Sequence, residues 1–182
     1  MVKKLSVPFV LGIFMLFIIP VFYLVDYSQE INLTKQDKIE YTLPHPGILP
    51  DHPLYVFKAA RDKLMEFFTR DSIKKAELYL LFSDKRVKMA EELATKGKNN
   101  LAISTFSKAE KYSLKIPEIL RESKQQGVAP TAALIEKLKL SNEKHREIYS
   151  HLLETLPEGE QEGLSLIGEL NLQVSNEIST LK

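Results

Sequence analysis

The four histidines of this 182-residue chain are the side chains best suited to proton exchange or metal binding near neutral pH. His45 and His52 share a proline-rich segment, while His145 and His151 lie six positions apart, on nearly opposite faces of a predicted helix. The chain has no H-E-x-x-H pattern and no histidine pair at the i, i+4 spacing of a zinc site on one helix face. We therefore expect no metal or cofactor. His145, on an apolar stripe, is predicted to be a hydrogen-bonded boundary residue.

Serine and carboxylate side chains form no recognisable catalytic pattern either. No serine lies in a G-x-S-x-G sequence, and the S-x-x-K match from Ser72 to Lys75 falls where helix capping explains the serine. Glu91 and Glu92 are consecutive on a predicted helix, so their carboxylates do not converge. No glycine-rich phosphate loop is present. We predict that the protein has no catalytic residues and is not an enzyme.

A stretch without any charged side chain spans residues 5–25 and includes Leu5, Phe14, Pro20 and Val25. A helix of this length reaches about 30 Å, the thickness of the hydrocarbon core of a bilayer. The stretch is longer than the apolar part of a secretory signal and has no small-x-small cleavage triplet at its end. It favours an uncleaved transmembrane anchor over a cleaved signal peptide.

The charges that flank the apolar stretch predict its orientation. Lys3 and Lys4 precede it, whereas Asp26 and Glu30 follow it. Because basic residues are retained on the cytoplasmic side, we expect residues 1–4 to be cytoplasmic and the rest of this single-pass protein to lie outside the cell membrane. An exported location disfavours nucleic acid as a partner. The chain has no cysteine, so this domain must be stabilised by its core without disulfides.

The composition then divides the remainder into a connecting segment and a helical domain. Residues 26–50 read as a tether and a proline-rich strap, because Leu43–Tyr55 contains four prolines and one glycine. Residues 51–182 form the predicted domain, with Asp51 as a candidate N-cap of its first helix.

The domain is predicted to be all-α, because its apolar residues recur at helical spacing and no alternating strand pattern appears. Short loops between amphipathic helices predict an antiparallel bundle of about five helices. In the helix that begins near residue 99, Pro117 either introduces a kink or starts a new short helix. The expected helices span about 53–68, 73–96, from 99 or 100 onward, 131–156 and 160–181.

Two of these helices carry a clear apolar stripe. The last one has a heptad seam interrupted by Asn171, which fits either oligomerisation or packing within the domain; its members are Leu164, Ile167, Asn171, Val174, Ile178 and Leu181. The first one places Phe57, Ala60, Leu64 and Phe68 on one face. We expect Leu54, Tyr55 and Phe57 to pack structurally and not to form a ligand site. Leu49, Pro50 and Pro53 belong to the same structural strap.

The sequence I-L-P-D-H-P-L-Y-V-F-K, followed by K-K-A-E-L-Y-L-L-F-S-D-K-R-V-K-M-A-E-E-L, resembles the bacterial and archaeal domain-of-unknown-function family 5667. The resemblance covers about residues 48–111, and the usual leucine after Arg86 is Val87 here. It implies an exported helical domain, often behind an N-terminal membrane segment, and implies no activity. The matching positions are Leu49, Pro50, Pro53, Leu54, Tyr55, Lys58, Lys75, Ala76, Glu77, Arg86 and Glu91.

Charge is distributed unevenly along the domain. From Lys58 to Arg146 there are 20 basic and 12 acidic side chains, a net charge of +8, whereas from Glu147 to Lys182 seven acidic side chains and one lysine give −6. One interpretation is that the two parts meet or form surface ion pairs, each worth about 0–1 kcal/mol. The other is a basic face held against anionic lipid or an anionic envelope polymer.

These observations favour a membrane-anchored helical module outside the cytoplasm that binds a protein partner or an envelope component. Its anchor partner would be the lipid bilayer, through residues 5–25. One alternative is a ligand-sensing bundle, which requires an apolar cavity of a few hundred Å³ between helices. A second is an enzyme acting on envelope polymers, which requires two carboxylates, or a histidine and a carboxylate, to meet in a cleft.

Overall fold

The computed structural model describes residues 41–181. The predicted anchor, with Leu5, Phe14, Pro20 and Val25, and the tether up to residue 40 lie outside the described residues. Among the helices of the described part, none combines the length and the apolarity needed to cross a membrane.

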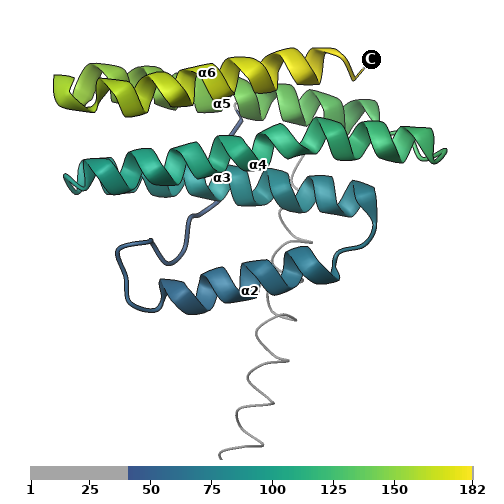
Figure 1. The fold of residues 1–182 in the computed structure, drawn as a ribbon, viewed down its shortest axis with the longest axis horizontal. Coiled ribbons are helices and arrows are strands. Elements are labelled where there is room, and N and C mark those ends of the chain that lie inside the picture. The colour runs from purple at the N-terminus through teal and green to yellow at the C-terminus, as the bar shows by residue number, and fades with distance from the viewer. Residues whose placement is uncertain (1–40, 182) are drawn as a thin grey trace, which may run out of the picture. The chain divides into compact units, whose positions relative to one another are not determined.

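Within residues 41–181, the helices begin at Tyr55 and no β-strand is present, as the all-α prediction requires. Helices α3 to α6 lie side by side as a bundle, and α2 lies as a separate layer against α3 (Figure 1). The domain is therefore a four-helix bundle with one added helix. The elements are α2 (Tyr55–Phe68), α3 (Ser72–Thr95), α4 (Asn99–Gln125), α5 (Ala132–Thr155), the 3-10 turn η1 (Glu158–Glu160) and α6 (Gln161–Ser179).

Local sequence signals account for several helix ends. The Asp71 side chain caps α3 by accepting a hydrogen bond from the Lys74 amide at 2.8 Å, and Thr131 caps α5 in the same way through Leu134. Gly97 adopts a φ of 69°, a left-handed conformation that ends α3 and lets the chain reverse into α4.

The structure corrects or decides three expectations about where helices begin and end. Asp51 does not cap the first helix; α2 begins at Tyr55, and the Asp51 carboxylate instead pairs with Lys98 at 2.7 Å. Ser72 is the first residue of α3 and leaves the capping to Asp71. Pro117 lies inside α4, which continues past it, so the chain does not restart a helix there.

The core consists of two apolar clusters. One contains Leu80, Ile116, Leu138 and Val174, and the other contains Val87, Phe106, Leu152 and Ile167. Each cluster takes residues from all four bundle helices, so the clusters occupy opposite halves of the bundle. Between them each helix contributes buried polar side chains: Ser83, Asp84, Glu110, Ser113, Ser141, Asn142, His145 and Asn171.

The heptad seam of α6 packs inside the domain. Leu164, Ile167 and Val174 are at most 1 % exposed. Its polar member is buried as well: the side-chain amides of Asn171 and Asn142 each donate to the other's backbone carbonyl, at 3.2 and 3.1 Å. Of the two interpretations of this seam, the internal one therefore accounts for it.

Candidate functional site

The middle of the polar layer is a histidine held between two carboxylates. His145 of α5 has no exposed surface. Its Nδ1 lies 3.0 Å from Glu110 Oε1 of α4, and its Nε2 lies 3.0 Å from Asp84 Oδ1 of α3. An imidazolium ring donates to both carboxylates, whereas a neutral ring donates to only one.

Asp84 has two further partners. The Ser141 hydroxyl donates to Asp84 Oδ1 at 2.6 Å, and the Tyr41 hydroxyl donates to Asp84 Oδ2. Tyr41 is the first described residue and comes just before the proline-rich strap, so this bond fastens the start of the strap to the centre of the bundle.

Electrostatics favour the imidazolium form. Burial alone would lower the pKa of His145, but the charges and hydrogen bonds of Glu110 and Asp84 outweigh it and raise that pKa to about 9. Burial, together with the charge of Asp84, raises the pKa of the Tyr41 hydroxyl, which therefore stays a donor. The raised pKa keeps His145 protonated at neutral pH, between the carboxyl groups of Glu110 and Asp84.

The network is enclosed in the core, and this limits the chemistry that it can perform. Asp84 and Glu110 bring to His145 the histidine–carboxylate pairs that an enzyme would need, but inside the core and not in a cleft. Both ring nitrogens are occupied, so neither is available to a substrate or a cation. Within residues 41–181, no group of three acidic, histidine or cysteine side chains is arranged to hold a metal ion.

Sequence reasoning placed His145 on the right stripe but at the wrong depth, since the residue is in the core and not at its boundary. It also missed Asp84 and Glu110. A signal existed, because each carboxylate interrupts the buried face of its own helix. The other histidines, His45, His52 and His151, are exposed.

A second polar centre holds the strap. Lys58 of α2 is buried, and its Nζ donates to the carbonyls of Pro46 at 2.5 Å and Ile48 at 3.2 Å. Burial lowers the pKa of Lys58 to about 8, although the nearby Asp62 carboxylate opposes the shift. Lys58 thus fixes the path of the strap just before the chain enters α2.

The predicted strap residues are divided between the core and the surface. Leu49 is buried, and Pro50 and Tyr55 are half-buried. Pro53 is exposed, and so are Leu54 and Phe57, which were expected to pack. The expectation is wrong for these two residues because α2 presents a different side to the bundle.

That inner side of α2 is polar. The Asp62 carboxylate is buried. Its Oδ1 lies 2.6 Å from the Arg61 guanidinium, and its Oδ2 lies 3.9 Å from the guanidinium of Arg86 of α3. The Tyr79 hydroxyl of α3 donates to Glu66 Oε1 at 2.7 Å. Arg86 and Lys58, two positions of the family resemblance, are therefore among the groups that join α2, the strap and the bundle.

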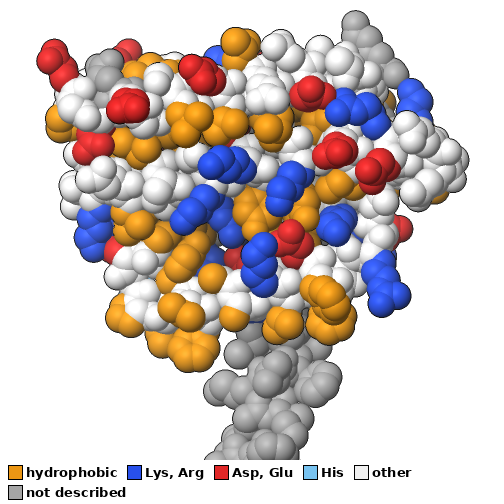
Figure 2. Space-filling model, in the orientation of Figure 1, with side chains coloured by type: hydrophobic (Ala, Val, Ile, Leu, Met, Phe, Trp, Pro, Cys, Tyr) orange, Lys and Arg blue, Asp and Glu red, His pale blue; other side chains and the backbone are white. Residues whose placement is uncertain are grey.

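The outer side of α2 is apolar and exposed. Val56, Phe57, Phe67 and Phe68 are each more than 70 % exposed, and Leu64 is 48 % exposed. We call these five residues the outer face of α2. In Figure 2 hydrophobic side chains gather along the edge of the domain that α2 forms. A helix of a globular domain ordinarily turns this stripe to the core.

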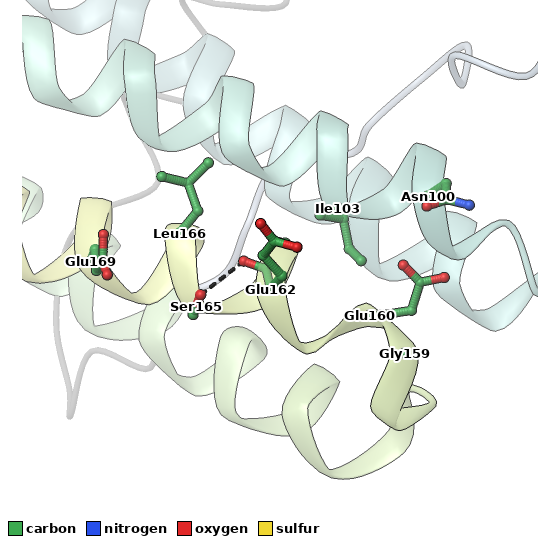
Figure 3. A pocket seen from close by; sticks show the side chains of 9 residues that line it. Asn100, Ile103, Gly159, Glu160, Glu162, Ser165, Leu166 and Glu169 are labelled. Carbon is green, nitrogen blue, oxygen red and sulfur yellow. Dashed lines mark hydrogen bonds between the residues drawn. The ribbon is translucent and has the colours of Figure 1, made fainter.

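A third feature is a surface groove of about 530 Å³ between the first turns of α4 and α6. Figure 3 shows Ile103 and Asn100 of α4 facing the start of α6, where Ser165 donates to the backbone carbonyl of Glu162. The groove is open and has three glutamates at its rim, unlike the enclosed apolar cavity that a ligand-sensing bundle requires. It is lined by Asn100, Ile103, Gly159, Glu160, Glu162, Gly163, Ser165, Leu166 and Glu169.

Comparison with known proteins gives one match. The family model described as a domain of unknown function (DUF5667) matches residues 47–159. This range contains the whole resemblance noted from the sequence and extends it through α5. No curated protein and no solved structure was found to match.

Proposed function

Since this chain belongs to the DUF5667 family, whose description states no activity, we propose from its own residues that it is a membrane-anchored binding module. Residues 5–25 would anchor it in the cell membrane, with residues 1–4 in the cytoplasm and the helical domain outside. The outer face of α2 would bind a component of the envelope. The protein would perform no catalysis.

The observation that carries this proposal is the reversed polarity of α2. Its charged residues Lys58 and Asp62 are buried, while the apolar Phe57, Phe67 and Phe68 are exposed. Exposed aromatic side chains that share one helix face are typical of a surface that is covered when the protein works. No comparable face lies over the His145 network, which is closed.

The anchor is tested by fractionation of the full-length protein. We expect the chain to remain in the membrane pellet after alkaline carbonate extraction, and a variant lacking residues 5–25 to be released. A protease added outside intact cells or spheroplasts should degrade the domain. Release of the full-length chain by carbonate would contradict the anchor.

The binding surface is tested by photocrosslinking in cells. A benzophenone amino acid in place of Phe67 should form an adduct, whether to protein, lipid or polymer. The matched control carries the same probe in place of Leu172, which is 59 % exposed on α6. Equal adduct yields at the two positions would overturn the proposed role of α2.

A further inference from the structure

We propose that the outer face of α2 lies in the interfacial region of the bilayer, with Phe57, Leu64 and Phe67 in contact with lipid. This inference rests on the proposed function and specifies the partner of its binding surface. It assigns α2 as a second membrane contact, in addition to residues 5–25.

The geometry of α2 suits a helix that lies flat on a membrane. At about 100° per residue, its five exposed apolar side chains fall within an arc of roughly 120°. The arc begins at Val56 in the first turn and ends at Phe67 and Phe68 in the last. One continuous apolar strip therefore follows the entire helix, as in interfacial helices.

The charges of α2 favour lipid over a basic or neutral protein surface. Its only acidic residues are Asp62, which is buried and pairs with Arg61 and Arg86, and Glu66, which accepts from the Tyr79 hydroxyl and pairs with Lys63. Basic side chains lie at the margins: Arg70 after α2 and Lys74 in the first turn of α3 are exposed, and Lys63 beside the arc is exposed while paired with Glu66 at 2.9 Å. Apolar residues bordered by cations are the pattern that anionic membranes attract.

The attachment of α2 to the bundle explains how this helix can be held by its polar side while its apolar side stays exposed. Lys58, Asp62 and Glu66 hold α2 through polar contacts with the strap and α3. Met65 is half-buried and packs against the core, so the five residues of the outer face are not needed for packing. In addition, the chain carries its own charge-free stretch at residues 5–25, which keeps a bilayer close to the domain.

The test uses the full-length chain reconstituted into mixed phosphatidylcholine and phosphatidylglycerol vesicles. The protein has no tryptophan, so Phe67→Trp provides a single fluorescent reporter at the outer face. Leu172→Trp is the matched control on exposed α6. Vesicles with bromine on the upper acyl carbons should quench the reporter in the α2 variant at least about twofold and leave the reporter in the α6 variant nearly unchanged.

The other outcomes separate this inference from the proposed function. If the chain does not float with the vesicles, the anchor itself is absent and both proposals fail. If it floats but the α2 reporter is quenched no more than the α6 reporter, the lipid contact is wrong while the anchor stands. A blue-shifted α2 reporter that bromine does not quench would assign the face to a second copy or to another part of the chain, and would also overturn the lipid contact.

Discussion

Helices α2 and α6 are both amphipathic, yet they use their apolar residues in opposite ways. In α6 the stripe is buried in the bundle, and its one polar member, Asn171, is paired with Asn142. In α2 the apolar stripe is exposed and the charged residues Lys58 and Asp62 are buried. The difference lies in the neighbours. Helix α6 packs against apolar side chains of the bundle. Helix α2 instead contacts carbonyl groups of the strap and a guanidinium and a phenol of α3.

The comparison implies that a buried polar or charged side chain depends on its partners, and the His145 network is the densest such group in the described residues. The largest effect is expected at His145. We expect His145→Ala to lower the free energy of unfolding by about 4 kcal/mol, because it leaves Asp84 and Glu110 buried without their cation. Urea unfolding of the detergent-solubilised full chain, followed by circular dichroism, measures this change.

The control for that substitution is His151→Ala, at an exposed position of the same helix. Its effect should stay within about 0.5 kcal/mol. A similar loss for both variants would mean that the network contributes no more than a surface position of α5.

The second prediction contrasts the two stripes directly. Ile167→Ala in α6 removes a side chain with no exposed surface and should cost about 3 kcal/mol. Phe67→Ala in α2 removes a larger side chain that is 75 % exposed, and should change the same free energy by less than about 0.5 kcal/mol. Comparable losses in urea unfolding would show that the outer face of α2 is packed in solution.

These two stripes also show how far sequence reasoning reaches. Helical periodicity identified both stripes, and helices were predicted within about two residues of the structure at most ends, since capping at Asp71 and Gly97 is a local property. The direction in which a stripe faces is not local. For α2 it depends on Arg86 and Tyr79, which lie on the next helix.

The same reason explains why the His145 network was not assembled from the sequence. Its members come from the strap, α3, α4 and α5, and no spacing along the chain relates Tyr41, Asp84, Glu110 and His145. The sequence did show that polar residues of the network lie on otherwise apolar helix faces. A polar residue at such a position requires a buried partner, without revealing which one.

The third prediction separates the two buried cations by pH. The pKa of His145 is raised from 6.5 to about 9 in the folded protein, so its stabilisation is complete below about pH 6.5 and is lost as the pH rises through 9. Between pH 6.5 and 8 we expect the free energy of unfolding to fall by about 1.5 kcal/mol. Urea unfolding across this interval measures the fall.

Lys58 contributes with the opposite sign at higher pH. Its pKa is lowered from 10.5 to about 8, so unfolding becomes less favourable as the pH rises from 8 toward 10.5. Most of the change below pH 8 therefore comes from His145, because Lys58 only begins to lose its proton there. His145→Gln should abolish the fall in that pH range, and an unchanged slope in this variant would assign the pH dependence to another group.

The smallest effect is expected where α2 meets the strap. Lys58→Met keeps a long side chain in the site but removes the donor to the Pro46 and Ile48 carbonyls. A lost buried hydrogen bond costs about 1 kcal/mol, and burial of the ammonium already offsets part of its benefit. We expect amide exchange in strap residues 41–50 to accelerate about fivefold, with α6 unaffected.

The locality of that response distinguishes two accounts of α2. If α2 is held mainly by polar contacts, Lys58→Met loosens the strap and α2 while the bundle keeps its stability, and Lys111→Met at an exposed position of α4 changes neither. If α2 is instead integrated with the core, exchange in α3 and α6 should accelerate together with the strap. That result would remove the contrast with α6, because both helices would then belong to one cooperative unit.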